Sequence, residues 1–184
     1  KSGDGRTVFR ASRDNTIIHC DGTLSDTTAT QSVLLCTEMS DSNPGDKVVL
    51  IGARAGKGST NNSIVAIGSE CCESGAGAET SAVGYFSGNS GPGGYNAFFG
   101  PRSGSKVTSG GTQNTLVGYR GGAGSTDGAT SITTGDYNVC IGSKSGGVSA
   151  ADNQIAIGYE AVATAANTAV IGNSSITSIA PGSN

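Results

Sequence analysis

Few side chains in this 184-residue sequence could act directly in acid–base, nucleophilic or metal chemistry. The only histidine is His19, so a Ser-His-Asp triad or an imidazole metal site would have to use it. The acidic residues are scattered, with no repeated aspartate motif of the calcium-binding kind. We therefore expect no enzyme and no cofactor. His19 is interpreted as structural; its one route to a metal or anion would be three copies meeting on a symmetry axis.

Five cysteines are present, and none are spaced as a CxxC pair, which argues against a zinc ribbon. Cys20 and Cys36 are separated by the same interval as the main repeat of the chain, and stacked coils of that length would bring them within disulfide reach. Two buried thiols fit the same spacing. We interpret Cys71 and Cys72 as free thiols and Cys140 as a small packing residue.

The charge and hydropathy of the sequence argue against nucleic acids and membranes as partners. The formal net charge is −3 and no long basic run is present, which gives no support to nucleic-acid binding. No apolar stretch approaches the roughly 20 residues of a membrane-spanning helix. We expect neither nucleic-acid binding nor membrane insertion.

A short apolar run that ends in glycine recurs along the chain and must position the remaining candidate residues. The gaps between successive repeat glycines are 16, 16, 16, 18, 24, 16 and 14 residues. These glycines are Gly52, Gly68, Gly84, Gly100, Gly118, Gly142, Gly158 and Gly172. So short a period predicts an all-β chain that winds as stacked coils of about 16 residues, a parallel β-solenoid or β-roll.

Each run is expected to be a strand that is covered on both faces. The residue before the repeat glycine is always bulky and apolar: Ile51, Ile67, Val83, Phe99, Val117, Ile141, Ile157 and Ile171. The residue one position earlier is also apolar: Leu50, Ala66, Ala82, Phe98, Leu116, Cys140, Ala156 and Val170. Neighbouring strand residues point to opposite faces. One face can fill the inside of the coil, and the other needs a partner, for which another copy of the chain is the obvious choice.

The residues after each repeat glycine predict a bend. The third residue is small, and in five coils a further glycine follows, which indicates a tight turn. A second, weaker strand is expected after the bend, as in residues 161–165. We divide the chain into an N-terminal lead-in segment with degenerate first coils (1–45) and the regular repeats (46–184).

Two kinds of surface feature are candidates for binding. Arg102, Arg120 and Lys144 occupy equivalent coil positions, and if aligned they form a basic stripe, either a contact for acidic glycans or an ordinary solvated ladder. The 24-residue unit carries a long insertion at 122–136, and a second loop lies at 88–95; insertions in solenoids often form the binding face. The receptor-contact candidates in these loops are Thr126, Asp127, Thr130, Thr133, Asn89 and Tyr95.

Three tyrosines directly follow repeat glycines: Tyr85, Tyr119 and Tyr159. They could stack on sugars or pack between chains.

The repeats resemble a known family. Segments 63–68 (SIVAIG) and 153–158 (NQIAIG) are similar to the head repeats of trimeric autotransporter adhesins, the YadA-like heads. Segments 114–122 (NTLVGYRGG) and 135–146 (GDYNVCIGSKSG) resemble even more the repeats of phage and large-virus tail fibres. Residues 171–179 are similar to the stretch upstream of an endosialidase-type intramolecular chaperone domain in such fibres. The resemblance covers residues 46–180 well and residues 1–45 poorly.

The resemblance implies a left-handed β-roll with three chains around an axis, intertwined or side by side. It favours a structural fibre protein at a virion surface that attaches to a host-surface glycan or protein. A cellular, extracellular adhesin head is the alternative, and a glycan depolymerase with a site between subunits is a third, less favoured interpretation.

Overall fold

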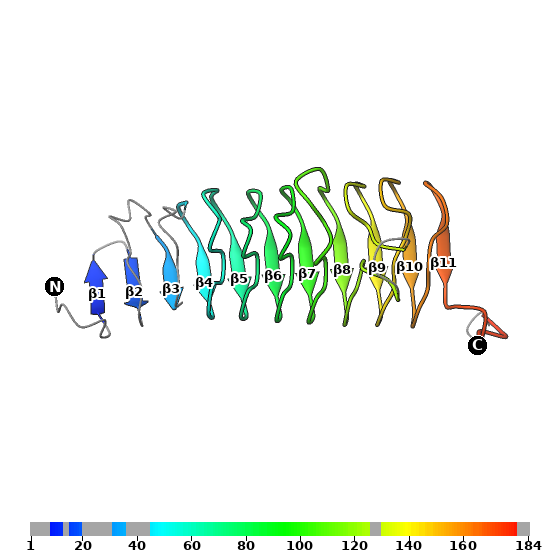
Figure 1. Cartoon of the computed structure of the whole chain (residues 1–184), viewed down its shortest axis with the longest axis horizontal. Coiled ribbons are helices and arrows are strands. Elements are labelled where there is room, and N and C mark those ends of the chain that lie inside the picture. Colours follow the sequence, from blue (N-terminus) through cyan, green and yellow to red (C-terminus); the bar gives the residue numbers. More distant parts are fainter. Residues whose placement is uncertain (1–7, 13–14, 20–30, 36–44, 126–129, 180–184) are drawn as a thin grey trace, which may run out of the picture.

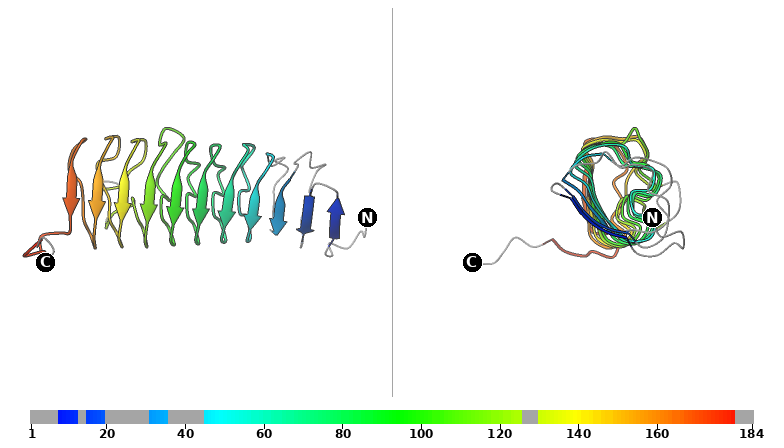
Figure 2. Two further views of the ribbon diagram at one scale, coloured as in Figure 1. Left: turned by 180° about the vertical axis from the view of Figure 1, so that it is seen from behind. Right: turned by 90° about the vertical axis from the view of Figure 1, so that its left-hand side faces the viewer.

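The computed structural model describes residues 8–12, 15–19, 31–35, 45–125 and 130–179, which form one eleven-stranded sheet with no helix among them. The strands are β1 (Val8–Ser12), β2 (Asn15–His19), β3 (Val33–Leu35), β4 (Val49–Ile51), β5 (Val65–Ile67), β6 (Ser81–Val83), β7 (Ala97–Phe99), β8 (Thr115–Val117), β9 (Val139–Ile141), β10 (Ile155–Ile157) and β11 (Ala169–Ile171). They follow one another across the sheet in chain order, and the coils superpose in the end-on view (Figures 1 and 2). Each coil is named below after its strand.

The ladder is parallel and in register from β3 to β11. Its partner residues run from Val33 opposite Val49 to Ile155 opposite Ala169. From β4 onward the offset between partners along the chain equals the gap between the corresponding repeat glycines. The predicted solenoid of stacked short coils is therefore confirmed. The long units keep the strands aligned and place their extra residues between them.

The first strands depart from this register. β1 pairs antiparallel with β2, so it runs against the other strands (Figure 1). Ile17 of β2 lies opposite Leu34 of β3, one position beyond the Val33 that a continued period would place there. The one-period spacing expected for the first coils therefore holds between β3 and β4 but is wrong between β2 and β3. Cys20 and Cys36, whose pairing depended on that register, lie outside the described residues.

The middle residue of each three-residue strand points into the coil. Leu50, Phe98 and Leu116 are fully buried, whereas the residues on either side of them in the strand are partly or largely exposed. Alternation along a strand sends these flanking residues to the outer face. The row directly before the repeat glycines is thus the outward one.

The bend after each repeat glycine is fitted to the size of the buried strand residue. A Cβ on Gly56 would lie 2.6 Å from Leu50 Cδ2, and one on Gly122 would lie 2.5 Å from Leu116 Cδ1. In the β5 coil the strand contributes only Ala66, and Cys72 occupies the corresponding bend position despite a φ of 51°. In the β4 and β8 coils glycine therefore leaves room for a leucine, and in the β5 coil a thiol fills the space beside an alanine.

A ladder of buried amides closes the interior next to the strands. Asn114 N–H donates to Asn96 Oδ1 and Asn138 N–H donates to Asn114 Oδ1, both at 2.9 Å. Gln154 N–H continues the series to Asn138 Oδ1 at 2.8 Å. These side chains satisfy backbone N–H groups that would otherwise be buried without a partner.

The expected second strand is wrong for the described coils. Residues 161–165 contribute only an isolated parallel bridge between Gly146 and Val162. In the β4 to β10 coils, residues with positive φ follow the repeat glycine, such as Arg54 (59°) and Gly56 (65°). This left-handed backbone interrupts an extended strand.

The repeat glycines lie at a close approach between neighbouring coils. Gly118 has a φ of 117°, and its N–H donates to the carbonyl oxygen of Phe99 at 2.7 Å. A Cβ at this position would lie 2.6 Å from the carbonyl oxygen of Gly142 in the next coil. No side chain fits between the two backbones.

We predict that Gly118→Ala lowers the free energy of unfolding by about 3 kcal/mol, since it adds backbone strain to a backbone clash. Gly110→Ala is the matched control, because that glycine is exposed and its Cβ would meet only the side chain and Cα of Thr134. The control should cost less than about 1 kcal/mol. Chemical denaturation measures both, and equal losses would contradict the close-approach explanation.

Candidate functional site

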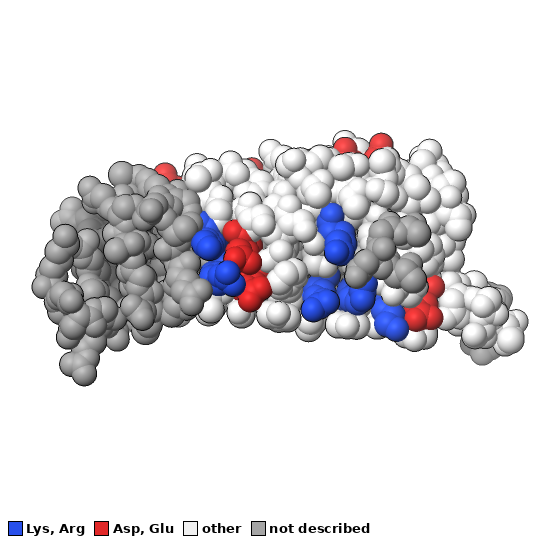
Figure 3. Space-filling model, in the orientation of Figure 1, with Lys and Arg blue, Asp and Glu red and all other residues white. Residues whose placement is uncertain are grey.

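One position of the repeat, two residues after the repeat glycine, forms a polar column along the outside of the solenoid. The N–H of Arg102 donates to the carbonyl of Tyr85 at 2.8 Å, and the N–H of Lys144 donates to that of Tyr119 at 2.8 Å. Arg120 is held in the same way by the carbonyl of Pro101 at 3.0 Å. The structure thus stacks Arg102, Arg120 and Lys144 on three consecutive coils, β7 to β9. Lysine and arginine side chains gather over these coils in Figure 3.

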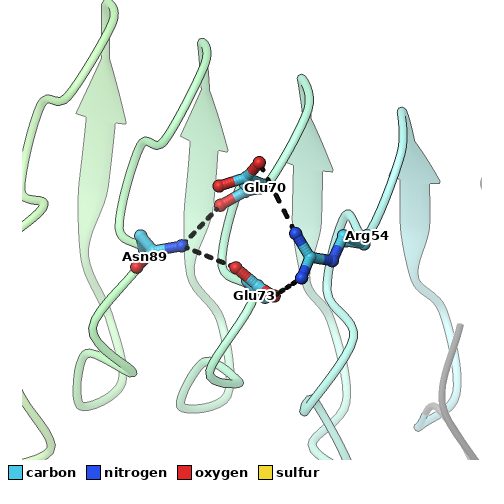
Figure 4. A network of polar contacts seen from close by, with 4 residues as sticks. All are labelled: Arg54, Glu70, Glu73 and Asn89. Atoms are coloured by element: carbon cyan, nitrogen blue, oxygen red, sulfur yellow. Dashed lines mark hydrogen bonds and ion pairs between the residues drawn. The ribbon is translucent and has the colours of Figure 1, made fainter. Parts of the chain in front are cut away.

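At the N-terminal end of this column opposite charges are paired. Arg54 Nη1 lies 3.6 Å from Glu70 Oε1, and Arg54 Nη2 lies 3.2 Å from Glu73 Oε1. Asn89 Nδ2 donates to the carbonyl of Glu70 at 3.1 Å and to Glu73 Oε2 at 3.3 Å. The four residues join the β4, β5 and β6 coils (Figure 4). Their side chains remain partly exposed, so each ion pair contributes at most about 1 kcal/mol.

At the C-terminal end Lys144 has a similar environment. Its Nζ lies 3.3 Å from Glu160 Oε1 and 5.8 Å from the ring centroid of Tyr159. The hydrogen bond to Glu160 raises the pKa of Lys144. Arg102 instead lies over an aromatic ring, with its Cζ 5.8 Å from the centroid of Phe86.

The candidate residues of the long insertion are only partly described. Thr126 and Asp127 lie outside the described residues. The hydroxyl of Thr133 bonds to the hydroxyl and the carbonyl of Ser149 in the next coil, and Thr130 is half-buried. Ile132 in the same insertion is fully buried. Part of this insertion is therefore core.

Backbone hydrogen bonds connect the loop at 88–95 to the described part of the insertion through the coil between them. Gly93 N–H donates to the carbonyl of Thr108, Thr108 N–H to that of Thr133, and Thr133 N–H to that of Ser149, at 2.8 to 3.1 Å. The two candidate loops therefore lie on one edge of the solenoid, with one coil between them. Tyr95 is 58% exposed there, whereas the amide of Asn89 is engaged with Glu70 and Glu73.

The outer face of the sheet is apolar and largely uncovered in the single chain. The exposed residues of this face include Phe99 (47%), Ile141 (40%), Ile155 (37%), Ile157 (38%) and Ile171 (55%). They lie in register on β7, β9, β10 and β11. Exposed apolar strips of this kind are typical of interaction surfaces.

No grouping for metal or membrane chemistry is found in the described part of the chain. Among those residues no cluster of three or more histidine, cysteine, aspartate or glutamate side chains could hold a metal ion. His19 is the last residue of β2, and its side chain lies outside the description. Among the same residues no helix is long and apolar enough to cross a membrane.

The three described cysteines, Cys71, Cys72 and Cys140, are buried free thiols. A side-chain hydrogen bond with Cys71, together with burial, raises the pKa of Cys72 well above its usual value. Burial raises the pKa of Cys140 to about 12. The thiol form, which is unreactive, therefore dominates at these two positions.

Comparisons with known proteins give no relative: no protein-family profile, no curated protein and no solved structure matches this chain.

Sequence reasoning found the polar column but missed its pairing. Glu73 and Asn89 were not linked to Arg54, although Asn89 follows Glu73, and Glu70 follows Arg54, at an interval of one regular repeat. The same interval separates Glu160 from Lys144. Opposite or complementary polar residues one period apart are the signal that could have found these contacts.

We predict that iodoacetamide at pH 8 leaves Cys71, Cys72 and Cys140 unmodified in the native protein and labels all three in guanidinium, because burial denies the reagent access to each thiol. Peptide mapping by mass spectrometry reads each site separately. Labelling of Cys140 in the native protein would contradict its buried position. Mapping without reductant also tests whether Cys20 and Cys36 form a disulfide.

Proposed function

We propose that this chain is a structural segment of an attachment fibre at a virion surface, a homotrimeric β-roll that presents loops to a host surface. The observation that carries the proposal is the outer sheet face, where aliphatic and aromatic side chains from successive coils stand in register and 37–55% exposed. Burial of such side chains is the main favourable term in association. Two further copies of the chain are the occupants proposed for this face; their number and the left-handed winding rest on the resemblance to fibre repeats.

The backbone supports a load-transmitting role. Every step from β3 to β11 is a parallel ladder, and additional hydrogen bonds join the turns of neighbouring coils. Stacked repeats of this kind contact only their neighbours, so the array works by presenting a surface along its length. Three copies of a weak contact on one stiff body gain avidity through effective concentration.

The loops on one edge are the proposed attachment sites. Segments 88–95 and 122–136 lie on that edge, separated by one coil, and Tyr95 is exposed there. Thr126, Asp127, Thr130, Thr133, Asn89 and Tyr95 remain the candidate contacts. Since Ile132 is buried, this residue serves the fold, and residues 126–129 of the insertion are proposed for recognition.

The oligomer is tested by light scattering of the purified chain. We expect a mass three times that of one chain. Ile157→Asp should dissociate it, since an unpaired charge in an apolar interface costs several kcal/mol, on the order of 3 kcal/mol per chain. Thr164→Asp, at an exposed position outside the sheet, is the control and should leave the mass unchanged. A stable wild-type monomer would overturn the proposal.

Attachment is tested by replacing residues 126–129 with Gly-Ser-Gly-Ser, which leaves Ala123 and Ile132 in the core. We expect labelled wild-type protein to bind at least one member of a panel of intact microbial and eukaryotic cells, and the variant to bind it at least tenfold more weakly at unchanged oligomeric mass. Absence of wild-type binding to the whole panel, or equal binding by the variant, would contradict the assigned role of the insertion.

A further inference from the structure

The position directly after the repeat glycine carries a tyrosine on every second coil from β6 to β10. Tyr85, Tyr119 and Tyr159 belong to the β6, β8 and β10 coils and are 47%, 46% and 57% exposed. The coils between them have Pro101 and Ser143 at this position. Since neighbouring strands lie about 4.8 Å apart, successive tyrosines of this row stand roughly 10 Å apart along the solenoid.

The three cations of the polar column lie beside this tyrosine row. Lys144 of the β9 coil lies over the Tyr159 ring of the β10 coil. Arg102 of the β7 coil lies over Phe86 of the β6 coil, whose ring is 5.6 Å from that of Tyr85. The two rows therefore form one strip, with tyrosines on the β6, β8 and β10 coils and cations on the β7, β8 and β9 coils.

The column contains opposite charges in neighbouring coils at its two ends and like charges on the three coils β7 to β9. Arg54 is followed one coil later by Glu70, and Lys144 by Glu160, each at salt-bridge distance. Arg102, Arg120 and Lys144 instead follow one another on consecutive coils at about 4.8 Å per step. These three residues place positive charge along this part of the column, and positive charge attracts an anionic ligand.

We propose that this strip binds one chain of an acidic polysaccharide that lies along the solenoid axis. The pyranose rings would stack on Tyr85, Tyr119 and Tyr159, whose rings offer a flat apolar face with a polar edge. Carboxylate or sulfate groups would pair with Arg102, Arg120 and Lys144. The step of roughly 10 Å between tyrosines matches two sugar rings of an extended chain. This inference rests on the proposed attachment function and names its ligand class.

Single-stranded nucleic acid fits the strip less well. Its bases stack on aromatic rings and its phosphates need cations, but it presents one base per nucleotide and calls for a wider basic groove. The chain as a whole carries a net charge of −3, which opposes a long polyanion of high charge density. A polysaccharide with one acidic group per disaccharide needs only one cation for each step of the tyrosine row.

The test uses the full chain and octasaccharides of hyaluronate, alginate and heparin, with cello-octaose and an oligothymidylate as comparison ligands, in calorimetric titrations. We expect binding of at least one acidic octasaccharide that weakens as salt is raised, and no binding of cello-octaose. Tyr119→Ser, which installs the residue found at this position in the β5 and β9 coils, should weaken binding about tenfold. Arg102→Gln should weaken it about fivefold.

Two matched controls remove the same groups elsewhere. Tyr137→Asn deletes a tyrosine that is 57% exposed, at a repeat position where Asn153 and Asn167 stand in later coils. Lys47→Gln removes a positive charge at that same position, where Gln113 stands in the β8 coil. Both controls should bind as the wild type does. If Tyr119→Ser fails to fold, Tyr159→Ser provides the same test.

The outcomes separate this inference from the proposed function. An intact trimer that binds none of the acidic octasaccharides overturns the inference and leaves the trimer standing. Binding that survives both Tyr119→Ser and Arg102→Gln, or that is equally tight for oligothymidylate, overturns it as well. A wild-type chain that is monomeric yet binds in the expected way overturns the proposed trimer but supports polysaccharide binding by the strip.

Discussion

The structure depends on one constraint: each coil must repeat the backbone path of its neighbour closely enough for their N–H and C=O groups to pair. The constraint is visible at the repeat glycines, where a Cβ on Gly68, Gly84 or Gly118 would lie 2.6 Å from a carbonyl oxygen of the next coil. Because the strands from β3 onward are only three residues long, no single coil could hold this register alone. Neighbouring coils therefore stabilise one another, and the regular spacing of the repeat glycines reflects this stacking.

The interior follows from the same constraint. Neighbouring coils place equivalent residues at the same level, so a polar group repeated along the chain becomes a ladder. Asn96, Asn114, Asn138 and Gln154 are joined in this way, each side-chain oxygen accepting from the next backbone N–H. In some coils the bend residue complements the buried strand residue: glycine faces Leu50 and Leu116, whereas Cys72 accompanies Ala66.

The outside of the solenoid divides into surfaces of different character. The outer sheet face is apolar, and we propose that it is covered by sister chains. One edge carries the stacked loops. The position after the strands carries charges that are paired at both ends of the column and alike in its middle, next to the row of tyrosines. Because the coils stack in register, side chains at one repeat position form a row along the solenoid.

The sequence by itself determined the solenoid, its strands and the alignment of Arg102, Arg120 and Lys144, because a fixed period leaves little freedom in how coils stack. It could not decide which apolar row faces inward, since Leu50 and Ile51 are equally hydrophobic; the turn geometry decides, by directing Leu50 toward Gly56. It also predicted a second strand at residues 161–165, which contribute only an isolated bridge. Only the tertiary structure showed that Ile132 of the insertion is core, that Cys71, Cys72 and Cys140 are all buried and that Asn89 joins the Arg54 network. Those features depend on side-chain contacts between coils. The repeat period shows which coils are neighbours but not which of their side chains touch.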